Sequence, residues 1–262
     1  MNTIRVAVQG ALGKVGREVV NAVSHDPSLL LVGAVDIKSV GNSLPLPDAS
    51  VSVPLSTDLD SLLTMTRPDV IVDFTVAKST VAAVPIATRH KVNMVIGTTG
   101  FTDDNLKEFD RLAKANGVGI VVAPNFALGA VVMMHLAKIA AKYFDHAEVI
   151  ELHHDQKVDA PSGTALSTAK AMAKARGKAF TAGPGDTLDS RGLQVDGIAV
   201  HSVRLPGLMA HQEVLFGASG QTLSIRHDTI NRECYMPGVL LAVKEVGKHK
   251  GLVLGLDTIL GL

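Results

Sequence analysis

Residues 4–16 read Ile4-Arg5-Val6-Ala7-Val8-Gln9-Gly10-Ala11-Leu12-Gly13-Lys14-Val15-Gly16. The apolar run over 4–8 predicts a strand, and the helical pattern over 13–24 predicts a helix directly after it. Glycine at the connection permits a tight turn and lets the backbone come close to a pyrophosphate. The free N–H groups and the positive dipole end at the start of the helix favour the same anion. The stretch therefore predicts a dinucleotide site.

An acidic residue stands where such a site needs an acceptor for a ribose hydroxyl. Asp36 lies 20 residues beyond Gly16, at the end of a second predicted strand over 29–36. The glycine spacing is G-x-x-G-x-x-G rather than G-x-G-x-x-G, and an ordinary strand–turn–helix would give the same triplet. The preceding strand, the following helix and Asp36 together favour the cofactor interpretation.

The first half of the chain alternates short apolar runs with helical patterns. Strands are predicted over 69–74, 93–96 and 118–123, and helices over 79–89 and 103–116. Continuous apolar strands that alternate with helices favour a parallel, doubly wound sheet. The loops Gly97-Thr98-Thr99-Gly100 and Ala123-Pro124-Asn125-Phe126 follow two of these strands. Ligands bind at this edge of such sheets, although plain turns would leave the same pattern.

The pattern of predicted strands and helices changes after Asn125. Helical patterns cover 128–143 and 164–174, a strand is predicted over 147–154, and a Gly- and Asp-rich stretch spans 181–197. Three further apolar runs, over 198–204, 213–216 and 222–227, indicate a largely antiparallel sheet. A helix over 232–248 and a strand over 252–254 end the chain. The second part is therefore predicted to be an α+β domain.

Composition excludes several classes of partner. The 25 basic and 25 acidic residues balance, so there is no general attraction to nucleic acid or to an anionic membrane. The chain has no Trp and two Tyr, which disfavours an aromatic stacking surface. No apolar run reaches membrane-spanning length, and the first residues form a strand pattern rather than a signal peptide. The single cysteine fits a reducing compartment, so we expect a soluble cytoplasmic protein.

The side chains best suited to catalysis are concentrated in Glu151-Leu152-His153-His154-Asp155-Gln156-Lys157-Val158-Asp159-Ala160-Pro161-Ser162-Gly163-Thr164. His153 and His154 end a predicted strand, where alternation sends their side chains to opposite faces, and Lys157 follows in the loop. A reductase that adds a hydride to one carbon must protonate its neighbour, and histidine or a desolvated lysine suits that task. Surface histidines without a catalytic role would give the same pattern. Zinc-ligand spacing is lacking, so no metal is expected.

The end of this segment leads directly into a helical pattern. Ser162 or Thr164 could cap that helix, and its free N–H groups could hold a carboxylate. An ordinary N-cap is the alternative interpretation.

The run from His153 to Thr164 closely resembles the signature of the 4-hydroxy-tetrahydrodipicolinate reductase (dihydrodipicolinate reductase) family. The resemblance covers the whole chain and includes the glycine turn, Asp73-Phe74-Thr75, the loops 97–100 and 123–126, and His201-Ser202-Val203-Arg204. It implies reduction of a small cyclic dicarboxylate to tetrahydrodipicolinate with loss of water, by NADH or NADPH, in the diaminopimelate route to lysine. It also implies a homotetramer.

The resemblance assigns roles by position. It implies a dinucleotide-binding domain over 1–125, completed by 233–262, and a substrate-binding and tetramerisation domain over 126–232. His153 matches the family's proton donor/acceptor and Lys157 its second proton donor, while His154, Gly163 and Thr164 match substrate contacts. The expected cofactor contacts are Gly10, Ala11, Leu12, Gly13, Lys14, Val15, Asp36, Gly97, Thr98, Thr99, Ala123, Pro124, Asn125 and Phe126.

Two departures from the family pattern concern the loop 205–211 and coenzyme choice. Many relatives have a Gly-rich stretch where this chain has Leu205-Pro206-Gly207-Leu208-Met209-Ala210-His211. Some relatives carry Arg directly after the acidic residue, and here that position is Ile37. Asp36 favours a free ribose hydroxyl, whereas Lys14 and Lys38 would attract a 2′-phosphate. We expect NADH to be used at least as well as NADPH.

Two other functions fit parts of the sequence. A semialdehyde dehydrogenase needs a cysteine nucleophile, and Cys234 lies at the predicted start of a helix, where a thiolate is stabilised. A non-enzymatic dinucleotide sensor would share the fold without the chemistry. The set of His153, Lys157 and the Ser162-Gly163-Thr164 run argues against a sensor.

Overall fold

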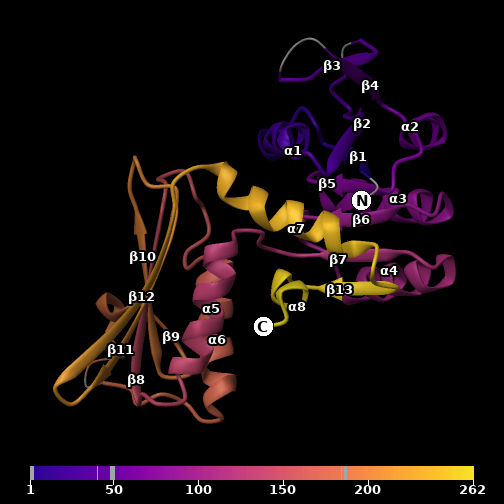
Figure 1. Ribbon diagram of the computed structural model, residues 1–262. Helices are drawn as coiled ribbons and strands as arrows, with labels where there is room; N and C mark the ends of the chain where they lie inside the picture. Colours follow the sequence, from indigo (N-terminus) through magenta and orange to yellow (C-terminus); the bar gives the residue numbers. More distant parts are fainter. Residues whose placement is uncertain (1–2, 40, 48–50, 184, 186–187) are drawn as a thin grey trace. The chain divides into compact units, whose positions relative to one another are not determined.

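The computed structural model describes residues 3–39, 41–47, 51–183, 185 and 188–262, and it divides into two units. Unit 1 comprises Met1–Ala127 and Tyr235–Leu262, and unit 2 comprises Leu128–Cys234. The chain thus enters unit 2 once and returns to complete unit 1. Colour in Figure 1 makes this visible, because yellow C-terminal elements stand among indigo and magenta ones.

Unit 1 is built on an eight-stranded sheet with the order β13-β7-β6-β5-β1-β2-β4-β3. All neighbouring strands run parallel except β3 and β4, which are antiparallel. The order reverses between β1 and β5, and ligands of such sheets bind beyond the carboxyl ends of the strands at that point. The strands are β1 (Ile4–Gln9), β2 (Leu29–Val35), β3 (Ser43–Pro45), β4 (Ser52–Ser56), β5 (Val70–Asp73), β6 (Asn93–Ile96), β7 (Gly119–Val122) and β13 (Gly251–Leu254).

Helices cover both faces of this sheet, as Figure 1 shows. On one face α2 (Leu59–Thr66), α3 (Ala77–Arg89) and α4 (Asp103–Asn116) bury side chains such as Leu62, Val84 and Phe109 against Ile71 and Met94 of the strands. On the other, α1 (Lys14–His25) and α7 (Met236–Val246) contact the sheet and one another. The helix α8 (Leu256–Leu260) ends the chain. The predicted doubly wound fold is confirmed.

Unit 2 contains a five-stranded sheet with the order β12-β11-β8-β10-β9. Its strands are β8 (His146–His153), β9 (Leu193–Val195), β10 (Ile198–Arg204), β11 (Ala210–Ala218) and β12 (Gln221–Thr229). Among the described strands only β8 and β10 pair in parallel, so the sheet is mixed and largely antiparallel, as predicted. The helices α5 (Leu128–Ala140) and α6 (Gly163–Arg176) bury apolar side chains against Val149, Val200 and Val214 on one face.

The structure corrects several predicted boundaries. The sequence pattern predicts nothing over 37–68, where β3, β4 and α2 lie, because these strands are short and α2 has only two turns. The helix expected over 232–248 begins instead as a 3-10 turn, Arg232–Tyr235, and α7 starts at Met236 with Pro237 in its first turn. The helix expected over 128–143 ends at Ala140. Among the described residues, no helix combines the length and apolar character needed to span a bilayer.

Candidate active site

The glycine turn links β1 to α1, and each of its three glycines meets a different constraint. Gly10 has a φ of +81°, and a Cβ there would lie 2.8 Å from the Phe74 carbonyl oxygen. Gly13 is the N-cap of α1 and supplies no side chain to bond the first amides of the helix. A Cβ on Gly16 would lie 2.0 Å from the Gly10 carbonyl oxygen. The turn is compact, and the amides that begin α1 stand ready for an anion.

Asp36 lies directly beside this turn, just past the end of β2. Its carboxylate accepts hydrogen bonds from the Leu12 N–H at 2.9 Å and from the Lys38 N–H at 2.9 Å. Asp36 is buried. A carboxylate has about four acceptor positions, so these two bonds leave capacity for a hydroxyl. Asp36 therefore holds the turn in shape and can accept a ribose hydroxyl.

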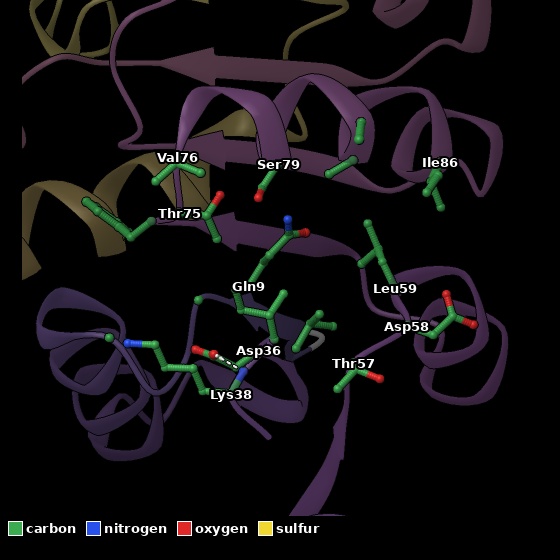
Figure 2. A pocket seen from close by; sticks show the side chains of 17 residues that line it. Gln9, Asp36, Lys38, Thr57, Asp58, Leu59, Thr75, Val76, Ser79 and Ile86 are labelled. Atoms are coloured by element: carbon green, nitrogen blue, oxygen red, sulfur yellow. Dashed lines mark hydrogen bonds between the residues drawn. The ribbon is translucent and has the colours of Figure 1, made fainter. Parts of the chain in front are cut away.

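An open pocket of about 510 Å³ adjoins the turn. Figure 2 shows Gln9 and Asp36 on one side and residues of α2 and α3 on the other. The second wall is mostly apolar and includes Leu59, Val76, Ala82, Ala83 and Ile86. This combination of an anion-binding turn, a carboxylate and an apolar wall fits a dinucleotide. The sequence pattern did not indicate this wall, because α2 lies in a stretch without a predicted element.

A buried carboxylate organises the neighbouring loops of unit 1. Asp73 ends β5 in register with Gln9 of β1. Its Oδ1 accepts bonds from the Thr75 N–H at 2.9 Å, the Thr75 hydroxyl at 2.6 Å and the Thr98 hydroxyl at 3.4 Å. Burial raises the pKa of Asp73, against the lowering effect of these bonds. Thr98 is thereby tied to the loop after β5.

Phe74 packs the remaining cofactor loops together. A Cβ on Gly97 would lie 2.1 Å from the Phe74 ring, so only glycine fits there. The rings of Phe74 and Phe126 are tilted, with their centroids 5.8 Å apart. The Asn125 side chain accepts a bond from the Ala127 N–H at 2.8 Å. The loops 97–100 and 123–126, expected separately from the sequence, thus meet around one aromatic residue.

In unit 2, β8 ends at His153, whose ring is bonded to a carboxylate two residues earlier. His153 Nδ1 lies 2.5 Å from Glu151 Oε2, and the Glu151 side chain is fully buried. Arg204 of β10 donates two hydrogen bonds to Glu151, at 2.8 and 2.9 Å. Burial alone would raise the pKa of Glu151, but the bonds from His153 and Arg204 hold it at about 2. Glu151 is therefore ionised at any ordinary pH.

Lys157 has an acidic partner of its own. Its Nζ lies 2.7 Å from Asp159 Oδ1, and this ion pair lowers the pKa of Asp159. His153 and Lys157 come from one short segment, as the sequence indicated, but each is bonded to a different carboxylate. The sequence pattern assigned no role to Glu151, Asp159 or Arg204. The Glu151–Arg204 pair depends on the register of β8 and β10.

The start of α6 lies next to this cluster. Ser162 is the N-cap, and its hydroxyl accepts the Ala165 N–H at 3.2 Å, while its own N–H donates to Glu151 Oε1 at 3.1 Å. A Cβ on Gly163 would meet no atom within 4 Å of the described structure. Gly163 also lacks a left-handed φ. The fold itself does not demand glycine at the first position of α6.

Cys234 lies in the 3-10 turn before α7, not at the start of an α-helix. Burial raises the pKa of its thiol, which opposes the thiolate that a nucleophile requires. Within the described residues, no group of three or more His, Cys, Asp or Glu side chains could hold a metal ion.

The fold, the pocket at the glycine turn and the cluster around Glu151 define a nucleotide-dependent α/β oxidoreductase. Its acid–base side chains lie in unit 2. Family models described as dihydrodipicolinate reductase N-terminus and C-terminus match residues 4–126 and 129–260. The chain belongs to the dihydrodipicolinate reductase family, which is NAD(P)H-dependent. The predicted family, fold class and enzyme class are confirmed.

Individual relatives agree along the whole chain. A 4-hydroxy-tetrahydrodipicolinate reductase of Dehalococcoides mccartyi is 58% identical over 100% of both chains. The enzyme of that name from Moorella thermoacetica is 49% identical over 98% of both chains. The solved structure of dipicolinate-bound dihydrodipicolinate reductase from Paenisporosarcina sp. TG-14 has a TM-score of 0.88 and 45% identity, covering 98% of this chain and 99% of that one.

The glycine turn yields a direct test. Gly16→Ala should destabilise the protein by about 1–3 kcal/mol, because the new methyl group would overlap the Gly10 carbonyl oxygen. Gly13→Ala is the matched control, since its methyl group would lie 3.1 Å from the same oxygen and needs only a small shift. Thermal unfolding of both variants measures the difference. Equal melting temperatures would contradict the close approach of α1 to β1.

Proposed function

We propose that this chain reduces 4-hydroxy-tetrahydrodipicolinate to tetrahydrodipicolinate, with loss of water, in the diaminopimelate route to lysine. The observation that carries the proposal is the arrangement in unit 2. There, a helix start suited to a carboxylate and a histidine suited to proton transfer are bonded to the same buried Glu151. The names of the relatives and the dipicolinate bound to the Paenisporosarcina enzyme support a cyclic dicarboxylate substrate.

We propose that the cofactor binds in unit 1. The pyrophosphate would lie on the amides of Gly10–Val15, the adenosine ribose on Asp36, and the adenine against the apolar wall of the adjoining pocket. The loops Gly97–Thr99 and Ala123–Phe126 would contact the nicotinamide end, beyond β6 and β7. When bound, the reduced nicotinamide supplies a hydride to the substrate.

His153 and Lys157 are the proposed proton donors. Loss of the 4-hydroxyl group and a hydrogen of the neighbouring carbon as water leaves a conjugated imine in the ring. Hydride addition at its far end then gives an enamine, which needs a proton on the neighbouring carbon. His153 beside Glu151 and Lys157 beside Asp159 are basic groups held by carboxylates and suited to that step. His154 would contact the substrate just beyond the end of β8.

The assembly is proposed to be a cytoplasmic homotetramer formed by unit 2. The sheet face opposite α5 and α6 carries Ile150, Leu152 and Leu215, which are only partly buried within one chain. Apolar side chains on an uncovered sheet face favour contact with another subunit. The single cysteine agrees with a reducing compartment.

The proposed proton donors can be tested together. His153→Ala combined with Lys157→Ala should lower kcat by about 10²–10⁴-fold, while the Kd for NADH stays within twofold, because both side chains belong to unit 2. NADH oxidation with the product of the preceding synthase measures kcat, and fluorescence titration measures Kd. Lys170→Ala, an exposed site on α6, is the control. Near-native turnover of the double variant would overturn the assignment.

The substrate site makes a separate prediction at Gly163. Gly163→Ala should raise the KM for the dicarboxylate about tenfold or more, since a methyl group would occupy the space where the carboxylate approaches the α6 amides. Its melting temperature should not fall, because no protein atom lies near the added Cβ. An unchanged KM in this stable variant would exclude the helix start as the carboxylate site.

Coenzyme choice depends on the charges around the glycine turn. Native protein should show a kcat/KM with NADH at least equal to that with NADPH, because the Asp36 carboxylate repels a 2′-phosphate. Asp36→Asn should shift the ratio several-fold toward NADPH, since the amide removes that repulsion and keeps an acceptor for the Leu12 N–H. A strong native preference for NADPH would mean that Lys14 and Lys38 outweigh Asp36.

A further inference from the structure

We infer that Glu151 is a positioning residue. It fixes the tautomer of His153 and the place of the His153 ring relative to the start of α6, and Arg204 is the counter-ion of Glu151. The inference rests on the proposed function for its catalytic meaning, but its structural content can be measured without turnover. It adds two residues, Glu151 and Arg204, to those that the sequence pattern assigns to the site.

The bonding of Glu151 decides which nitrogen of His153 faces the substrate. An ionised carboxylate can only accept hydrogen bonds, and Glu151 remains ionised because its partners hold its pKa at about 2. His153 Nδ1, 2.5 Å from Oε2, must therefore carry a hydrogen. Nε2 is then the nitrogen that gives and regains the proton, while Nδ1 keeps its own.

The second oxygen of Glu151 ties the histidine to the carboxylate site. Oε1 accepts the N–H of Ser162, the residue directly before Gly163 and Thr164. One rigid carboxylate thus sets the distance between the proton-carrying ring and the amides proposed to hold the substrate. Errors of about 1 Å in such distances are costly for catalysis.

Arg204 extends this arrangement to the lysine loop. Besides its two bonds to Glu151, its Nη2 donates to the carbonyl oxygen of Asp159 at 2.7 Å. Asp159 is the side-chain partner of Lys157. Arg204 therefore joins the end of β8 to the loop that carries the second proposed proton donor.

Core packing alone does not explain a glutamate at this position. Along the inward face of β8, the preceding residues Ala147 and Val149 are apolar and pack in the core of unit 2. A buried ion pair is often no more stabilising than apolar side chains of similar size. The glutamate is explained by what it orients, His153 and Ser162, rather than by core packing.

The test uses the full chain labelled with 15N-histidine. Solid-state 15N spectra of the native protein should show the neutral His153 ring with hydrogen on Nδ1, the signal being identified by its loss in His153→Asn. Glu151→Gln should give a mixture of tautomers and lower kcat about 10²-fold, with the Kd for NADH unchanged. A neutral His153 ring with its hydrogen on Nε2 in the native protein would overturn the inference. This outcome can be measured even if the enzyme is inactive with the proposed substrate.

Two further variants separate positioning from folding. The double variant Glu151→Gln with Arg204→Met serves if Glu151→Gln alone fails to fold. It removes both charges, so no lone charge is left buried. Retention of the Nδ1 tautomer and of native kcat in this double variant would also overturn the inference. Asp60→Asn is the matched control, because Asp60 of α2 likewise bonds a histidine, His90, at 2.7 Å and an arginine, Arg89, at 2.9 Å. It should leave kcat unchanged.

Discussion

The close approach of α1 to the end of β1, at Gly16 beside the Gly10 carbonyl, governs the geometry of the glycine turn. Because α1 begins almost in contact with the end of β1, its first amides face the carboxyl edge of the sheet. The same closeness brings the Leu12 N–H within reach of Asp36 at the end of β2. Gly10 and Gly13 line the pocket beside the turn and have no side chains to fill it.

Each unit contains a buried carboxylate, and the two are stabilised in opposite ways. Among the described residues, hydroxyl groups and an amide bond Asp73 and no cation pairs with it, and burial raises its pKa. Glu151 has Arg204 and His153 as partners, and its pKa falls to about 2. Glu151 is therefore a charged partner for the His153 ring, whereas hydroxyl groups and an amide bond Asp73.

The sequence predicted those features that depend on neighbours along the chain. The strand over 93–96 and the helix over 103–116 coincide with β6 and α4, since the apolar pattern of each lies within a short stretch of sequence. Asp36, His153 and Gly163 could be predicted for the same reason, because each lies at the edge of a motif formed by neighbouring residues. The sequence did not reveal the Glu151–Arg204 pair, whose members lie 53 residues apart and meet only through the register of two strands. It also missed α2, whose two turns are short for any periodic signal.

The return of the chain to unit 1 has a consequence for synthesis on the ribosome. β13 pairs with β7, and it is made after every residue of unit 2. Until Gly251–Leu254 emerge, one side of β7 has no strand to bond it, and its amides and carbonyls face water or a foreign strand. Unit 2 is continuous in sequence and can complete its own sheet first. During translation, the nascent nucleotide-binding half is therefore the last to close, although it is the first to begin.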